Sequence, residues 1–161
     1  MKIELFADGM NRKDIVKDPW RKASRAIIMR EGLLLVLYVP KLDVFLFPGG
    51  GRELGESALD CVLREVLEET GYPIMNVKEG ATVVEYFHDS TWENTYFLAN
   101  LASDQPQAVN WTEEEKAYGM EIKWMDPQDF LSILDEYDSK NPYGQAIHQR
   151  EFLGMVNSFG Q

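Results

Sequence analysis

The sequence predicts a single domain of the mixed α/β class, of the α+β type, in which a mixed β-sheet is flanked by helices. Short segments rich in branched apolar residues are interrupted by helical patterns without regular β-α-β alternation, which disfavours a doubly wound sheet. The length of 161 residues suits one domain, residues 1–161. No run of 18 apolar residues occurs, so a membrane-spanning helix is not expected.

Six segments have the composition and the bounding turn residues of β-strands. They are residues 24–29, 33–39, 44–47, 82–87, 94–101 and 121–125. Glu31-Gly32 lies between the first two and indicates a hairpin, and Pro48 ends the third. We expect residues 1–20 to form an N-terminal extension and residues 102–119 to form a polar loop.

Three segments have helical patterns. They are residues 58–70, 127–134 and 145–156. Ser57 is a suitable N-cap for the first helix, and Gly71 is a suitable residue after its last turn. At 100° per residue the apolar side chains of this helix gather on one arc, which we expect to face the core. They are Leu59, Val62, Leu63, Val66 and Leu67.

The same helix carries three carboxylates, Glu65, Glu68 and Glu69, within an arc of about 100°. Like charges three or four residues apart repel, and Arg64 can neutralise only part of this charge. A hard divalent cation such as Mg²⁺ could compensate the rest, because it prefers oxygen ligands. The alternative is an acidic face exposed to solvent. Gly49–Gly51, directly after a predicted strand, favour the cation, because glycine lets the backbone approach a ligand closely.

The spacing of these residues resembles the Nudix box, G-x5-E-x7-R-E-U-x-E-E-x-G-U, over residues 50–72. Its positions here are Gly50, Glu56, Arg64, Glu65, Val66, Glu68, Glu69, Gly71 and Tyr72. Tyr72 departs from the aliphatic residue that is usual at the last position, and Ile74 could take that role. The W-x-x-P-x-x-F stretch at 124–130 is also similar to the family.

The resemblance implies an enzyme that uses Mg²⁺, with Mn²⁺ as a substitute, to hydrolyse a diphosphate linkage in a nucleoside diphosphate derivative. By similarity, the metal ligands would be Glu65, Glu68, Glu69 and the carbonyl of Gly49. The catalytic group would be Glu65, Glu68, Arg64 and Glu56, with Arg64 orienting the glutamates. Glu65 would be a metal ligand or in part the general base, a role that the family assigns variably. The family also recruits a glutamate from a later loop, for which Glu113, Glu114 and Glu115 are the candidates.

For substrate binding we single out Arg25 and Arg52, which could meet phosphates, and Glu114 of the late cluster. Trp92, Trp111, Tyr86 and Phe87 could stack on a base, although packing in the core or at the rim of the site is the commoner role of such side chains. Residues 86–95 and 102–119 are the segments expected to set specificity.

The expected substrate is a nucleoside triphosphate. The alternatives are ADP-ribose, a dinucleoside polyphosphate, or binding of a nucleotide without turnover. The net charge of −11 argues against binding to a nucleic-acid polymer. No membrane partner is expected, a homodimer is possible, and the absence of a recognisable secretory signal together with a single cysteine favours the cytoplasm.

Other reactive side chains have simpler interpretations. His88, Asp89 and Ser90 are adjacent and are expected to form a polar turn. Cys61 lies in the middle of the first helix and is expected to be a small core residue. His148 in the last helix is expected at the surface or at an interface.

Overall fold

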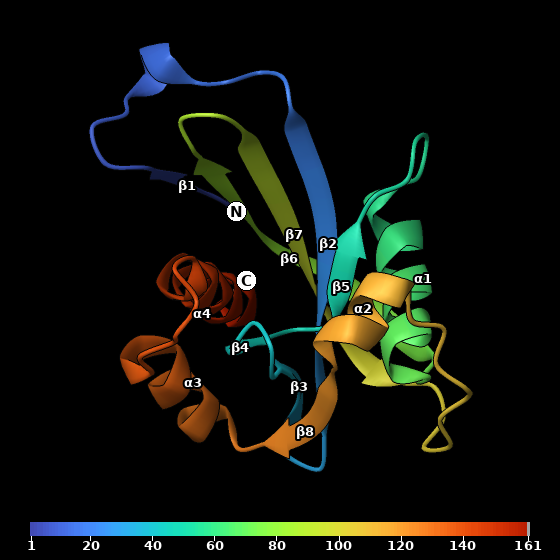
Figure 1. Cartoon of the computed structure of the whole chain (residues 1–161). Helices are drawn as coiled ribbons and strands as arrows, with labels where there is room; N and C mark the ends of the chain where they lie inside the picture. The colour runs from blue at the N-terminus through green and yellow to red at the C-terminus, as the bar shows by residue number, and fades with distance from the viewer. Residues whose placement is uncertain (161) are drawn as a thin grey trace.

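The computed structural model describes residues 1–160 as a mixed sheet with helices on both of its faces (Figure 1). The strands are β1 (Lys2–Phe6), β2 (Trp20–Arg30), β3 (Leu33–Val39), β4 (Val44–Leu46), β5 (Gly49–Gly51), β6 (Ile74–Tyr86), β7 (Thr91–Leu101) and β8 (Glu121–Met125). The helices are the 3-10 helix η1 (Arg12–Asp14), α1 (Ala58–Thr70), α2 (Glu113–Tyr118), α3 (Pro127–Glu136) and α4 (Gly144–Phe159). Within residues 1–160, no helix has the length and apolar character needed to cross a lipid bilayer.

The order of the strands in the sheet is β1-β6-β7-β2-β3-β4, with β5 paired to β2 and β8 paired to β3. The β1–β6 and β2–β7 pairs are parallel, and the other pairs are antiparallel. The predicted hairpin between β2 and β3 pairs only near its turn, at Met29–Leu34 and Arg30–Leu33. Beyond these residues β2 runs beside β7. The prediction of a mixed sheet flanked by helices is confirmed.

The sequence-based prediction omits the short helix η1 and three further elements. Strand β1 lies within the segment expected as an N-terminal extension, and its pairing with β6 makes it part of the sheet. Strand β5 consists of three glycines, which are depleted in strands. Helix α2 lies within the expected loop 102–119 and begins with a capping box between Thr112 and Glu115. That T-x-x-E signature was visible in the sequence.

Two apolar clusters fill the two faces of the sheet. The alternation of side chains along β2 sends Ala26 toward α1 and its neighbour Ile27 toward α3 and α4. In Figure 1, α1 lies to the right of β2 and α4 lies to its left. The sheet therefore separates two cores, and any residue on β2 or β7 can be assigned to the α1 side or the α4 side.

Helix α4 supplies hydrogen-bond acceptors to the short segment that leads into β5. The Phe45 N–H donates to Nε2 of His148 at 3.0 Å, and the Phe47 N–H donates to Oε2 of Glu151 at 2.9 Å. His148 is 1% exposed, so the expectation that it lies at the surface is wrong. Nothing in the sequence indicated that the His148 ring would accept a hydrogen bond from Phe45, 103 residues earlier in the chain.

Asp43 ties the turn after β3 to the segment between α3 and α4. Its carboxylate accepts hydrogen bonds from the Lys140 N–H and from the hydroxyls of Tyr137 and Tyr38. The backbone hydrogen bond from Lys140 is the strongest of the influences that hold the pKa of Asp43 below its ordinary value of 3.8, and the two hydroxyls add to it. Folding therefore favours the ionised carboxylate.

Replacing Asp43 with Asn tests this network through the pH dependence of stability. A carboxyl whose pKa is depressed by folding stabilises the fold above its unfolded pKa, and that contribution is lost as the pH falls through the folded pKa. We expect Asp43→Asn to lower Tm at neutral pH, and the gap to wild type to close as the pH falls below 3.8. Thermal unfolding from neutral to acid pH measures the gap. The exposed Asp138→Asn is the control, and a gap independent of pH would contradict this account.

Candidate active site

The inner face of α1 is acidic. Val62 and Val66 are buried as predicted, but Leu59 and Leu63 are 44% and 38% exposed, so their expected place in the core is wrong. The side chain turned inward beside the valines is Glu69, which is only 8% exposed. The helix therefore directs carboxylates, rather than its leucines, toward the glycine strand β5.

Glycine at positions 49 and 50 allows β5 to pass close to these carboxylates. A Cβ at Gly50 would lie 2.5 Å from the carboxyl carbon of Glu65, and a Cβ at Gly49 would lie 2.1 Å from the Ser24 carbonyl oxygen. The Gly49 N–H donates to Oε2 of Glu69 at 3.0 Å. A residue with a side chain would displace either the strand or the glutamate at this point.

Arg64 connects the remaining box residues. Its Nε and Nη2 donate to the two carboxylate oxygens of Glu56 at 2.7 and 3.0 Å. Its Nη1 donates to Glu65 at 2.8 Å and to Glu68 at 3.2 Å, and Nη2 also reaches the Gly51 carbonyl. The hydrogen bond from Arg64 lowers the pKa of Glu56 to about 2. Arg64 is thus held by a bidentate pair on one side and orients two carboxylates on the other.

In the carboxylates deeper in the site the pKa is raised, whereas that of Glu56 is lowered. Burial raises the pKa of Glu65, and the charges of Glu68 and Glu115 add to this effect. Burial also holds the pKa of Glu69 well above its usual range, and Glu65 and Glu115 again add to it. Three carboxylates from two helices therefore lie close enough to repel one another.

The late glutamate that the structure brings to this cluster is Glu115. Its Oε1 accepts the Thr112 N–H of the α2 capping box, while its Oε2 is buried and has no hydrogen-bond partner in the described chain. Glu113 is exposed and pairs with Lys116, and Glu114 is exposed. The sequence-based choice of Glu114 thus selected the right helix but an outward-facing residue. The capping box could have identified Glu115, since it fixes which glutamate turns back.

Arg25 and Arg52, the two candidate phosphate contacts, do not point to the same place. Nε of Arg25 donates to Oδ1 of Asn94 at 3.0 Å, and its Nη1 donates to the Phe47 carbonyl at 3.2 Å. Nη2 of Arg52 donates to Oγ1 of Thr95 at 3.2 Å. Because adjacent residues of a strand point to opposite faces, Arg25 lies on the α4 side of β7 and Arg52 on the α1 side. Arg25 is the one whose charge acts on Glu69.

The donor set suits a hard divalent cation. Within residues 1–160, no three His, Cys, Asp or Glu side chains converge into a ready-made metal site as they stand. The orphaned Oε2 of Glu115 and the mutual repulsion of Glu65, Glu69 and Glu115 are nevertheless the features that a bound cation would resolve. Glu65, Glu68, Glu69 and Glu115, with the carbonyl of Gly49, are the groups that could hold it.

Sequence reasoning missed a buried charge network beside this cluster. Glu151 is 0% exposed, and it accepts hydrogen bonds from the Tyr96 hydroxyl at 2.8 Å and from the Arg150 guanidinium at 2.7 and 2.9 Å. Arg25 lies 3.6 Å from the same carboxylate. The only signal in the sequence was the adjacent charged pair Arg150 and Glu151 directly before an apolar stretch of α4.

Other candidates have structural roles. Cys61 is buried and its thiol donates to the Gly50 carbonyl at 3.3 Å, which confirms it as a core residue. Tyr86 is 2% exposed and stacks on Phe6, so its ring is not free for a ligand. Nε1 of Trp111 donates to the Glu69 carbonyl at 2.8 Å and fixes the end of α1.

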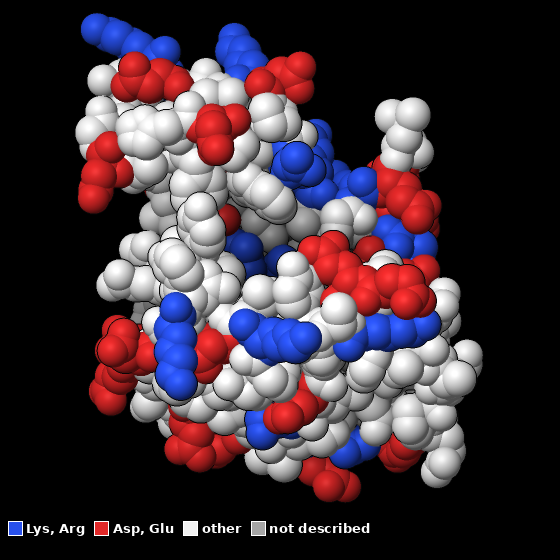
Figure 2. Space-filling view, in the orientation of Figure 1, with Lys and Arg blue, Asp and Glu red and all other residues white. Residues whose placement is uncertain are grey.

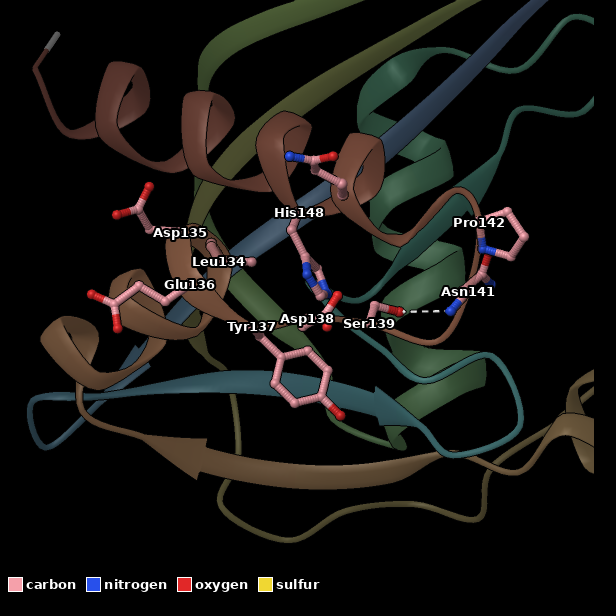
Figure 3. A pocket seen from close by; sticks show the side chains of 10 residues that line it. Leu134, Asp135, Glu136, Tyr137, Asp138, Ser139, Asn141, Pro142 and His148 are labelled. Carbon is pink, nitrogen blue, oxygen red and sulfur yellow. Dashed lines mark hydrogen bonds between the residues drawn. The ribbon is translucent and has the colours of Figure 1, made fainter.

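A cavity of about 420 Å³ lies apart from the glutamates, where α3 meets α4 (Figure 3). Tyr137, Ser139, Asn141 and His148 are among its lining residues, and Asp135 and Glu136 point away from its centre in the figure. The Asn141 N–H donates to the Ser139 hydroxyl across one side. These residues belong to the connections around Asp43 and β4, so the cavity is part of the structural support of the fold.

Comparison with known proteins is consistent with this geometry. The model of the NUDIX domain matches residues 19–146. The uncharacterized Nudix hydrolase YvcI of Bacillus subtilis (strain 168) is 29% identical over 123 residues, a match that covers 70% of each protein. A MutT NUDIX hydrolase from Burkholderia pseudomallei has a TM-score of 0.58 at 20% identity and covers 83% of this chain and 98% of its own. A MutT protein from Bacillus halodurans has a TM-score of 0.57 at 24% identity, covering 70% and 72%.

Replacing Gly50 with Ala tests the close approach of β5 to Glu65. The new methyl group would push the Glu65 carboxylate aside, and a flexible side-chain end can move at small cost to the fold. We expect Tm without metal to change little and the rise in Tm on adding Mg²⁺ or Mn²⁺ to shrink, because linkage to a bound ion weakens. Gly51→Ala is the matched control, since its Cβ would lie 4.0 Å from the nearest atom. Equal metal responses in the two variants would refute the role of Gly50.

Proposed function

This chain belongs to the NUDIX domain family, and from that premise we propose that it is a Mg²⁺-dependent pyrophosphohydrolase of nucleoside triphosphates. The family's hydrolases act on nucleoside diphosphate derivatives and generally use divalent metal ions. The observation that carries the proposal is the close approach of the half-buried Glu65 and the buried Glu69 to the glycine strand, where the charge of Glu115 also acts on both carboxylates.

The proposed cation site consists of Glu65, Glu68, Glu69, Glu115 and the carbonyl of Gly49. When bound there, Mg²⁺ would shield the negative charge of the phosphates and lower the pKa of a water. Without a cation, these carboxylates would repel a polyphosphate. The need for a cation therefore follows from the charge of the chain's own residues.

The protein groups around the site have separate proposed roles. Glu56 fixes Arg64, and Arg64 in turn fixes Oε1 of Glu65 and Oε2 of Glu68. The Glu68 side chain is 35% exposed, more than that of Glu65 at 14%. We assign it the removal of a proton from the attacking water, because solvent reaches it. Arg25, which is held by Asn94 and whose charge acts on Glu69, is the proposed contact for a phosphate.

The proposed reaction is tested with a panel of nucleoside triphosphates, sugar nucleotides, ADP-ribose and dinucleoside tetraphosphates. We expect triphosphates to be converted to monophosphate and pyrophosphate, no turnover in excess EDTA, and recovery when Mg²⁺ is added back. Release of pyrophosphate and monophosphate is measured by chromatography. Turnover of ADP-ribose alone would overturn the choice of substrate, and turnover that persists in EDTA would overturn the metal dependence.

The contribution of Glu115 is tested by Glu115→Gln, with Glu114→Gln as the matched control on the same short helix. Gln keeps the size of the side chain and removes the charge next to Glu65 and Glu69. We expect kcat/KM to fall about 10-fold to 100-fold, in line with loss of a group that supports a metal site, and the Mg²⁺ concentration for half-maximal activity to rise. The control should stay within about twofold. Equal effects of the two substitutions would show that neither glutamate enters the site.

A further inference from the structure

The α4-facing side of the sheet carries a group of polar and aromatic side chains on β2, β6 and β7, which we call the floor. The register pairs Glu85 of β6 with Trp92 of β7, and Arg25 of β2 with Tyr96 of β7. Side chains two residues apart on a strand share a face, so Trp92, Asn94 and Tyr96 point to one side. Tyr96 donates to Glu151 of α4, which identifies this side as the α4 side. Glu85 and Asn94 are diagonal neighbours on it, at about 7–8 Å between backbones.

Figure 2 shows that the molecule is hollowed above α4, between this helix, α2 and the strands behind them. Atoms of both acidic and basic residues lie at the bottom of the hollow. Ion pairs on this side of the sheet join Arg25 to Glu151 and Arg150 to Glu85, so residues of both signs occur there. The hollow is therefore polar and charge-balanced, unlike the acidic cluster at α1.

Asn94 carries an unused hydrogen-bond donor on this floor. The residue is 1% exposed, and its Oδ1 accepts the bond from Nε of Arg25. Its Nδ2 is buried without a hydrogen-bond partner in the described residues. A buried amide N–H without an acceptor is costly in a folded protein. This donor points to an acceptor that the chain itself does not supply.

Glu85 lies on the same floor and has acceptor capacity of its own. It is 5% exposed, and its ion-pair partner, Nη1 of Arg150, is 3.9 Å away, beyond hydrogen-bond distance. The Arg150 guanidinium is instead engaged by Glu151 at 2.7 and 2.9 Å. The Glu85 carboxylate thus keeps capacity to accept hydrogen bonds from a ligand.

Trp92 supplies an aromatic surface on the same side. It is 38% exposed, and the Arg21 guanidinium lies 5.3 Å from its ring centre. An exposed indole next to polar groups is suited to stacking on a planar base. Arg25, which contacts both Asn94 and the segment at Phe47, links this floor to the glutamates of α1.

We propose that Glu85, Asn94 and Trp92 bind the base of the nucleotide, and that they select guanine. The proposal rests on the proposed function for the phosphate end, which Arg25 and a cation on the α1 glutamates would hold. Guanine is the common base whose pairing edge offers two adjacent N–H donors beside a carbonyl oxygen. Both oxygens of Glu85 accept from N1–H and N2–H, and Nδ2 of Asn94 donates to O6. Adenine offers the carboxylate only one donor group.

The test is calorimetric binding of GMP, IMP and AMP to the full chain in EDTA, without turnover. We expect GMP to bind more tightly than IMP, which lacks N2–H, and IMP more tightly than AMP. Glu85→Gln should lower the affinity for GMP by about tenfold or more, because an amide N–H would then face the N–H groups of the base. The affinity for AMP should change by less than about threefold. Glu93→Gln is the matched control, since Glu93 is on the opposite face of β7 and accepts from Trp20.

Folding and function are separated by two further measurements. Circular dichroism and Tm establish that each variant is folded. Trp92→Phe should retain the preference for guanine, whereas Trp92→Ala should lower the affinity for all three nucleotides. Equal affinities for GMP and AMP in wild type, or unchanged GMP binding in folded Glu85→Gln, would overturn the base site. If GMP binding depends on Glu85 but no nucleoside triphosphate is hydrolysed, the base site stands and the proposed hydrolysis fails.

Discussion

Two buried carboxylates on opposite faces of the sheet hold one short segment of chain. Oε2 of Glu151 in α4 accepts the Phe47 N–H, and Oε2 of Glu69 in α1 accepts the Gly49 N–H. Pro48 between them has no N–H to satisfy. The backbone that enters β5 is therefore fixed from both helices within three residues. The approach of Gly50 to Glu65, and with it the geometry of the whole acidic cluster, depends on this placement.

Buried carboxylates are paired with arginines on one side of this segment and lie beside other carboxylates on the other side. On the α4 side, Glu151 is matched by Arg150 and Arg25, which hold its pKa below the usual value although burial opposes ionisation. On the α1 side, burial and neighbouring carboxylates raise the pKa of Glu65 and Glu69. Uncompensated buried charge is expensive, and proteins retain it where a ligand or ion supplies the missing partner. The contrast distinguishes a part of the fold whose buried charges are paired from the part in which we propose the cation site.

The elements that could be predicted from the sequence are those that depend on residues close together in the chain. Ser57 and Gly71 bound α1 as predicted, and the box spacing identified Glu65, Glu68 and Glu69 before their surroundings were known. The exposure of Leu59 and the burial of Glu69 reverse the usual hydrophobic pattern, because the neighbour of that face is a glycine strand rather than an apolar core. Strand β5 has no side chains to form a pattern. The partnership of Glu151 with Phe47 spans a separation of 104 residues, which no local rule can anticipate.

That long separation has a consequence during synthesis on the ribosome. Domains generally form as the nascent chain emerges from its N-terminal end. The residues of the proposed cation site belong to its first and middle parts, yet the acceptors for Phe45 and Phe47 arrive only with His148 and Glu151. Until α4 has cleared the exit tunnel, the edge of β4 lacks these partners. Assembly of the glycine strand therefore waits until α4 has emerged.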